Sequence, residues 1–112
     1  MIKEKMIEQF HQPNNAEMHQ KSLVQSIIHL SPVLTEVLEQ GIEEGIFYTP
    51  YPQETIELLL SSAQVIFDDG LFQWKPEEMM RRAKAYIKMM EVSVGAKEGS
   101  FDYMIEVLMK QK

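Results

Sequence analysis

Proline and glycine divide this chain into segments in which apolar residues recur every three or four positions. Proline in the interior of a regular helix removes a hydrogen bond, and glycine after an apolar stretch favours a left-handed helix end. We find no segment in which apolar and polar residues alternate with the period of two that strands require. The sequence therefore predicts an all-α fold, a bundle of five to six helices.

The breaks define the expected helix bounds. Ser31 and Pro32 resemble a helix start, because serine is a good N-cap and proline suits the first helical turn. Gly45 is expected to end the same helix in a left-handed cap. Six helices are thus expected, over residues 2–12, 14–30, 31–44, 52–70, 76–94 and 101–110.

At 112 residues, with 45% hydrophobic and 25% charged side chains, the chain is expected to form one domain over residues 1–112. It has no cysteine, which excludes disulfides, thiolate zinc sites and a cysteine nucleophile. No apolar run approaches the ~20 residues of a membrane span, and the N-terminus lacks the apolar core of a signal peptide. We expect a cytoplasmic protein without membrane contact.

The net charge of −6 argues against nucleic-acid binding by this chain, because such affinity comes largely from neutralising phosphates. The basic residues cluster in the fifth predicted helix, where glutamates three or four positions away are expected to pair with them. The expected pairs are Glu77 with Arg81, Glu78 with Arg82, and Lys88 with Glu91.

Two predicted helices carry a second apolar edge beside their main apolar face. Leu58 and Val65 form it on the fourth predicted helix, and Met89 and Val92 on the fifth. A second apolar edge is buried either in the centre of the monomer or against a partner subunit. We favour the partner, and expect a two-fold homodimer in which these four residues lie at the interface.

The junction after the third predicted helix is a tight corner. Gly41 inside a helix costs about 1 kcal/mol relative to alanine, which indicates close approach of another group. After the cap at Gly45, Ile46 and Phe47 are expected to fold back as an apolar plug before Pro52 starts the next helix.

The stretch LSPVLTEVLEQGIEEGIFYTPYPQETIELLL, residues 30–60, resembles the middle of the C-terminal domain of TetR-type transcriptional regulators. In that family a helix entered through proline runs into two glycines, an apolar residue and a phenylalanine, and then a proline-led helix begins. The later segment FDDGLFQW fits the same layout. The matching residues are Pro32, Gly41, Gly45, Ile46, Phe47, Pro52 and Glu54.

This resemblance implies a domain that dimerises and binds a small effector, in a repressor whose N-terminal helix-turn-helix domain binds DNA. No short basic recognition helix occurs here, so DNA contact is expected only through a helix-turn-helix domain absent from this chain. Either the chain is a piece of a longer regulator cut at the domain boundary, which we favour, or it has lost its DNA-binding half. The alternative is a free-standing helical interaction module without a ligand.

A cavity for a small hydrophobic effector is expected among the second, third and fourth predicted helices. His19 and Leu23 share a helix face one turn apart, and Gln64 is a polar residue near the middle of an apolar helix. Phenylalanines and flexible methionines supply adaptable walls. The expected ligand-binding residues are Met18, His19, Leu23, Phe47, Gln64 and Phe67.

The sequence offers little for catalysis or metal binding. His11, His19 and His29 lack the spacing that places two ligands on one helix face. Asp68 and Asp69 are expected to pair with a neighbouring lysine or arginine, because a helix C-terminus disfavours carboxylates. No nucleophile–base motif or glycine-rich phosphate loop is present. No enzyme activity, metal or cofactor is expected.

Overall fold

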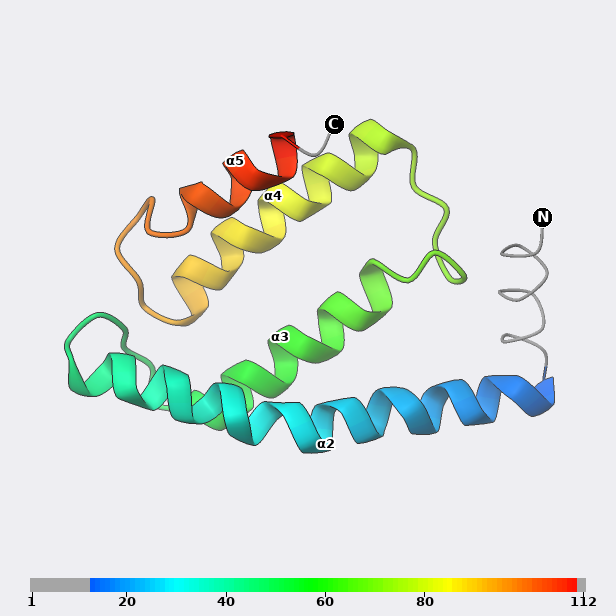
Figure 1. The fold of residues 1–112 in the computed structure, drawn as a ribbon, viewed down its shortest axis with the longest axis horizontal. Coiled ribbons are helices and arrows are strands. Elements are labelled where there is room, and N and C mark those ends of the chain that lie inside the picture. The colour runs from blue at the N-terminus through cyan, green and yellow to red at the C-terminus, as the bar shows by residue number, and fades with distance from the viewer. Residues whose placement is uncertain (1–12, 111–112) are drawn as a thin grey trace.

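The computed structural model describes residues 13–110, which form four α-helices and no strand (Figure 1). In chain order they are α2 (Pro13–Glu43), α3 (Pro52–Ile66), α4 (Pro76–Ser93) and α5 (Asp102–Lys110). The all-α prediction is confirmed. The expected five to six helices are not found in this part of the chain, and the first predicted helix, residues 2–12, lies outside it.

The predicted break at Ser31 and Pro32 is wrong. Helix α2 continues through Pro32 for 31 residues. A proline in a helix interior removes one hydrogen bond and crowds the carbonyl four residues earlier, at a cost of about 3 kcal/mol. Packing of α2 against α3 as one continuous helix, with Leu38 buried along it, offsets this cost. The second and third predicted helices are therefore one helix.

The buried stripe of α2 is made mostly of small residues. Ser31, Thr35, Leu38 and Gly41 recur every three or four positions and are all buried. Helix α2 packs against α3, and short side chains on this stripe let two backbones approach closely.

The helices form two hairpins, α2 with α3 and α4 with α5, joined through contacts between α3 and α4 (Figure 1). The Tyr86 hydroxyl on α4 donates a hydrogen bond of 2.7 Å to the Leu59 carbonyl on α3. The ring of Phe67 also packs edge-on against Tyr86, with 5.7 Å between centroids. These contacts fix the angle at which the hairpins meet.

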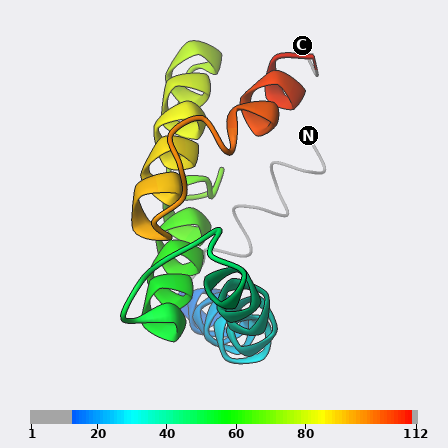
Figure 2. The ribbon, with the colours of Figure 1, turned by 90° about the vertical axis from the view of Figure 1, so that its left-hand side faces the viewer.

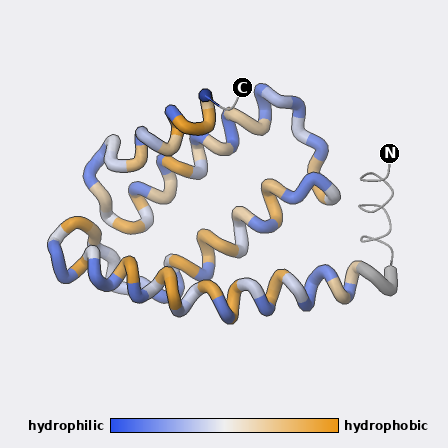
Figure 3. Tube along the Cα trace, viewed as in Figure 1, coloured by the Kyte–Doolittle hydropathy of each residue, from blue (hydrophilic) through white to orange (hydrophobic). Residues whose placement is uncertain are grey.

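The described helices form two layers, with α3 and α4 in one layer and α2 and α5 in the other (Figure 2). The Cα atoms extend 47 × 31 × 16 Å, and the short dimension is about what two packed helices occupy. Apolar residues nevertheless recur along all four helices (Figure 3). The described chain thus leaves large apolar side chains exposed on its outer faces.

The C-terminus of α2 confirms the predicted left-handed cap at Gly45 and the packing of Phe47, but Ile46, expected to fold back with Phe47, is 54% exposed. Gly45 has φ of 76°, its N–H donates to the Ile42 carbonyl, and the Ile46 N–H donates to the Gly41 carbonyl. This is the Schellman arrangement that a left-handed glycine closes. A Cβ on Gly41 would meet the ring of Phe47 at less than 3.0 Å, so the missing side chain makes room for that ring.

The end of α4 repeats this arrangement and meets the first corner. Gly95 has φ of 66°, and the Tyr48 N–H donates a hydrogen bond of 2.8 Å to the Val94 carbonyl. Phe47 also packs against Phe101, with 6.1 Å between ring centroids. The two hairpins are therefore joined at their loops as well as through Tyr86.

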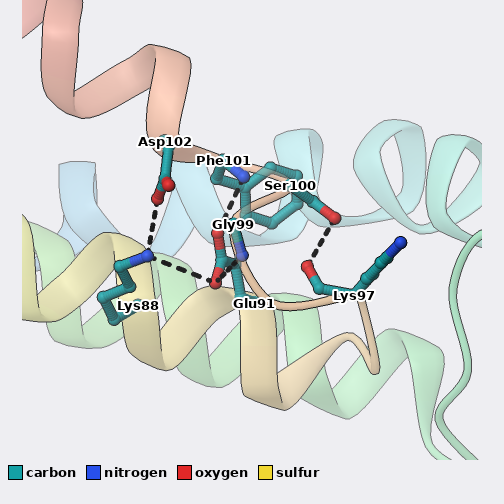
Figure 4. Close-up of polar contacts among 7 residues, drawn as sticks. All are labelled: Lys88, Glu91, Lys97, Gly99, Ser100, Phe101 and Asp102. Carbon is teal, nitrogen blue, oxygen red and sulfur yellow. Dashed lines mark hydrogen bonds and ion pairs between the residues drawn. The ribbon is translucent and has the colours of Figure 1, made fainter.

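A buried carboxylate holds the turn between α4 and α5 (Figure 4). Glu91 is 3% exposed and accepts hydrogen bonds from the N–H groups of Gly99 (3.1 Å) and Phe101 (2.7 Å). Lys88 Nζ lies 3.8 Å from Glu91 and 2.5 Å from Asp102 at the start of α5. The predicted pair of Lys88 with Glu91 is confirmed, and it belongs to a larger polar network that includes Asp102 and the backbone of Gly99 and Phe101.

Candidate functional site

A cleft of about 430 Å³ lies between the N-terminal half of α2 and the C-terminal end of α3. Its walls are largely aliphatic, with two polar residues among them. The lining residues are Ala16, His19, Gln20, Leu23, Val24, Val65 and Leu71.

A polar contact crosses the end of this cleft. His19 Nε2 on α2 lies 2.8 Å from Asp68 Oδ2, just beyond α3, and both side chains are mostly buried. The structure gives Asp68 a histidine partner 49 residues away in the chain, which the sequence analysis did not predict. This contact joins α2 to the segment just after α3. It also provides a hydrogen-bonding group that can orient a ligand.

The loop between α3 and α4, residues 67–75, forms one wall of the cleft through Leu71. It starts with a turn around Asp68, whose Oδ1 accepts the Gly70 N–H at 2.8 Å. Near its end, the indole N–H of Trp74 donates a hydrogen bond of 2.9 Å to the Ile66 carbonyl in the last turn of α3. A short polar turn and one aromatic anchor therefore set the shape of this wall.

The structure brings together some of the predicted ligand-binding residues. His19 and Leu23 line the cleft, and Val65, predicted at the dimer interface, lines it too. Gln64 is half-buried on α3, and its Oε1 has no hydrogen-bond partner among the described residues. Met18 is 67% exposed and is not among the lining residues.

The two predicted phenylalanines lie elsewhere. Phe67 packs against Tyr86 between α3 and α4. Phe47 packs against Gly41 and Phe101 at the opposite end of α2. Since the stretch of α2 from His19 to Gly41 spans roughly 33 Å, Phe47 lies far from this cleft and does not line it.

Four lining residues were missed by the sequence analysis. Ala16 and Gln20 share a helix face with His19 and Leu23, at the same spacing of three or four, so periodicity could have identified them. Val24 lies at the edge of that face. Leu71 lies in an irregular loop, where no periodic signal exists.

The basic residues of α4 are arranged differently from the prediction. In the described chain no ion pair joins Arg81 to Glu77 or Arg82 to Glu78. The Glu78 carboxylate instead accepts the Lys75 N–H in a capping box at the start of α4. The Arg82 guanidinium lies over the Trp74 ring, 3.6 Å from its centroid. Helix capping by Glu78 and ring stacking by Arg82 thus replace the predicted pair of Glu78 with Arg82.

The residues predicted at the dimer interface all lie on the surface of the described chain. Their exposed fractions run from 44% for Val65 to 80% for Val92, with Leu58 and Met89 between these values. In residues 13–110 no helix is long and apolar enough to cross a membrane. The same residues contain no cluster of three or more potential metal ligands.

Comparison with known proteins gives one family. The family described as "Tetracyclin repressor-like, C-terminal domain" matches residues 2–92. None of the curated proteins matches the chain.

Proposed function

The chain belongs to the tetracyclin repressor-like C-terminal domains, and on that premise we propose that it binds an effector and forms the homodimer of a transcriptional repressor. A helix-turn-helix domain outside these 112 residues would supply DNA binding. The proposal assigns no catalytic role to the chain, because domains of this family belong to regulators.

The cleft between α2 and α3 is the observation that carries the effector-binding half of this proposal. Its volume of about 430 Å³ lies in the range of small-molecule sites, roughly 300–1,000 Å³. Aliphatic walls favour an apolar ligand, and His19 with Asp68 supplies a polar group at one end. We therefore assign a small hydrophobic effector with one hydrogen-bonding group. Gln64, the other polar residue predicted to bind the ligand, is not among the residues that line the cleft.

Filling the cleft with a larger side chain tests this assignment. Native mass spectrometry of freshly purified protein should detect a retained small molecule, and Leu23→Trp should release it while the protein stays folded. Val33→Trp is the matched control, because Val33 is exposed on the same helix outside the cleft. Loss of the molecule from both variants, or from neither, would count against this cleft.

Exposed apolar edges on α3 and α4 support the homodimer. Leu58 and Val65 on α3, with Met89 and Val92 on α4, stand outside the buried faces of their helices. In a two-fold interface each residue meets the matching patch of the partner, so one introduced charge acts twice. The proposed interface is built around these four residues.

Sedimentation at micromolar concentration tests the interface. Val65→Glu changes the cleft as well as the edge, so Val92→Glu is the sharper variant, and it should shift the protein toward monomer. Val37→Glu is the matched control, because Val37 is an exposed valine on α2 outside the proposed interface. Dimers that persist unchanged in Val92→Glu and Val65→Glu would refute this arrangement.

The same exposed edges favour a second candidate, a helical interaction module without a small-molecule ligand. The two candidates differ in gene structure and in ligand content. An upstream reading frame that encodes a helix-turn-helix supports the repressor. Ligand-free protein in a complex with a different chain supports the module.

A further inference from the structure

Trp74, the one tryptophan in the sequence, stacks with both Phe72 and Arg82. Its ring is parallel to that of Phe72, with 5.0 Å between centroids and 6° between planes. The Arg82 guanidinium of α4 lies 3.6 Å from the Trp74 ring centroid. With its indole N–H bonded to the Ile66 carbonyl, one side chain thus contacts α3, the loop and α4.

The loop that Trp74 holds carries the cleft wall. The Asp68 carbonyl accepts the N–H groups of Leu71 (3.0 Å) and Phe72 (2.9 Å), so Leu71 lies between the Asp68 turn and the stack. The Leu71 side chain is about half exposed, so burial does little to hold it in place. Its position against the cleft depends on the backbone of this short loop.

We propose that Trp74 is a positioning residue for the effector cleft, and that Arg82 influences ligand binding through it; this rests on the function proposed above. The stack fixes Phe72, and Phe72 fixes the neighbouring Leu71 in the cleft wall. The bond from Trp74 to Ile66 closes the loop on the end of α3, which keeps Asp68 beside His19.

Arg82 separates this role from direct ligand contact. It belongs to α4 and is not among the residues that line the cleft. Arg82 also donates a hydrogen bond of 3.1 Å to the Glu78 carbonyl on its own helix, so a change at Arg82 reaches the cleft through the Trp74 contact or the start of α4, without ligand contact. The neighbouring Arg81 is exposed, and no hydrogen bond or ion pair joins its side chain to the described chain, so it offers a control with the same change in charge.

The experiment compares Arg82→Gln, Arg82→Lys and Arg81→Gln with the wild type by two measurements. Hydrogen exchange of the Leu71 and Phe72 amides reports how often the loop opens. Titration with Nile Red, an uncharged apolar dye, reports cleft binding, and the part of its signal lost in Leu23→Trp defines the cleft-bound fraction. In the wild type and the arginine variants, emission of the single tryptophan follows the stack.

In Arg82→Gln the two amides should exchange roughly two- to fivefold faster, as expected for loss of one cation–ring contact, and Nile Red affinity should fall by a similar factor. Arg82→Lys should restore part of both effects, and Arg81→Gln should match the wild type. Trp74→Phe, which keeps a ring but lacks the N–H donor to Ile66, should also accelerate exchange.

Equal exchange in Arg82→Gln and Arg81→Gln would overturn the positioning role. Faster exchange with unchanged Nile Red affinity would overturn it as well, because the stack would then shape the loop without affecting the cleft. If the dye binds the wild type and Leu23→Trp equally, the effector cleft itself fails, and with it the inference. The last outcome differs from the first two, so failure of the proposed function can be recognised.

Discussion

Replacing Gly95 by alanine should destabilise the protein more than the same change at Gly45. Both glycines close a Schellman arrangement at a helix end, with φ of 66° and 76°. Alanine in this left-handed region costs about 1 to 2 kcal/mol at either position. The two sites differ in what a new Cβ would meet, so the comparison isolates the contact between the hairpins.

At Gly45 no atom lies within 4 Å of the added Cβ, and we expect only the backbone cost. At Gly95 the Cβ would lie closer than 3.0 Å to the Tyr48 carbonyl oxygen and 2.9 Å from the Tyr48 nitrogen. Both are backbone atoms, so rotation of a side chain cannot relieve the overlap. The corner must move away, and the hydrogen bond from Tyr48 to the Val94 carbonyl is lost.

A lost hydrogen bond of this kind costs about 1 kcal/mol, and the contact of Phe47 with Phe101 is disturbed in addition. The free energy of unfolding should therefore fall by about 3 kcal/mol in Gly95→Ala, against about 1 to 2 kcal/mol in Gly45→Ala. The difference measures the junction between the two hairpins.

Urea denaturation followed by circular dichroism measures both changes. All proteins should be compared at one concentration, because dimerisation adds a stability that depends on concentration. The slope against urea should stay constant, so that the midpoints report stability. Equal losses in the two variants, within about 0.5 kcal/mol, would show that the α4 end and the Tyr48 corner are not in contact.

Three further predictions concern separate features. Glu91→Gln should lower the free energy of unfolding by about 2 kcal/mol in urea denaturation, because an amide oxygen can accept only one of the two N–H groups that Glu91 binds. Glu98→Gln, at an exposed position, should change it by less than about 0.5 kcal/mol, and equal changes in the two variants would contradict the role of Glu91. Burial raises the pKa of Tyr86, so the folded protein binds this proton more tightly and its stability should fall as the pH rises above about 10; the fall should be smaller in Tyr86→Phe. The Lys88 pKa, raised by its hydrogen bond to Asp102, adds a loss of the same sign to both proteins, and identical pH profiles would refute the Tyr86 contribution. The chain alone should give no sequence-specific shift of duplex DNA in a mobility assay at moderate salt, and specific retention would overturn this reading.

Local sequence determined the helical class and the positions of several helix ends. Glycine adopts positive φ without steric cost, so Gly45 and Gly95 end their helices where the apolar pattern stops. Gly41 also signalled a close neighbour, and the ring of Phe47 occupies that space. These features depend on residues within a few positions of each other, whose conformations near-neighbour sterics decide.

Local rules failed where packing outweighed them. Ser31 and Pro32 carry a good helix-start signal, yet α2 runs through both, because α2 packs against α3 as one continuous helix with Leu38 buried along it. Glu78 has an arginine at the spacing that favours an ion pair, but the backbone donor of Lys75 captures its carboxylate. Each competing interaction comes from capping or burial, which spacing alone does not weigh.

The cleft shows the same division between sequence and tertiary structure. Helical spacing placed His19 and Leu23 on one face of one helix, and that grouping follows from the rotation of about 100° per residue in an α-helix. The partners across the cleft, Asp68, Val65 and Leu71, come from α3 and the loop after it. Only the packing of α3 on α2 determined which of them would meet His19, because residues some 40 to 50 positions apart along the chain are brought together by tertiary contacts.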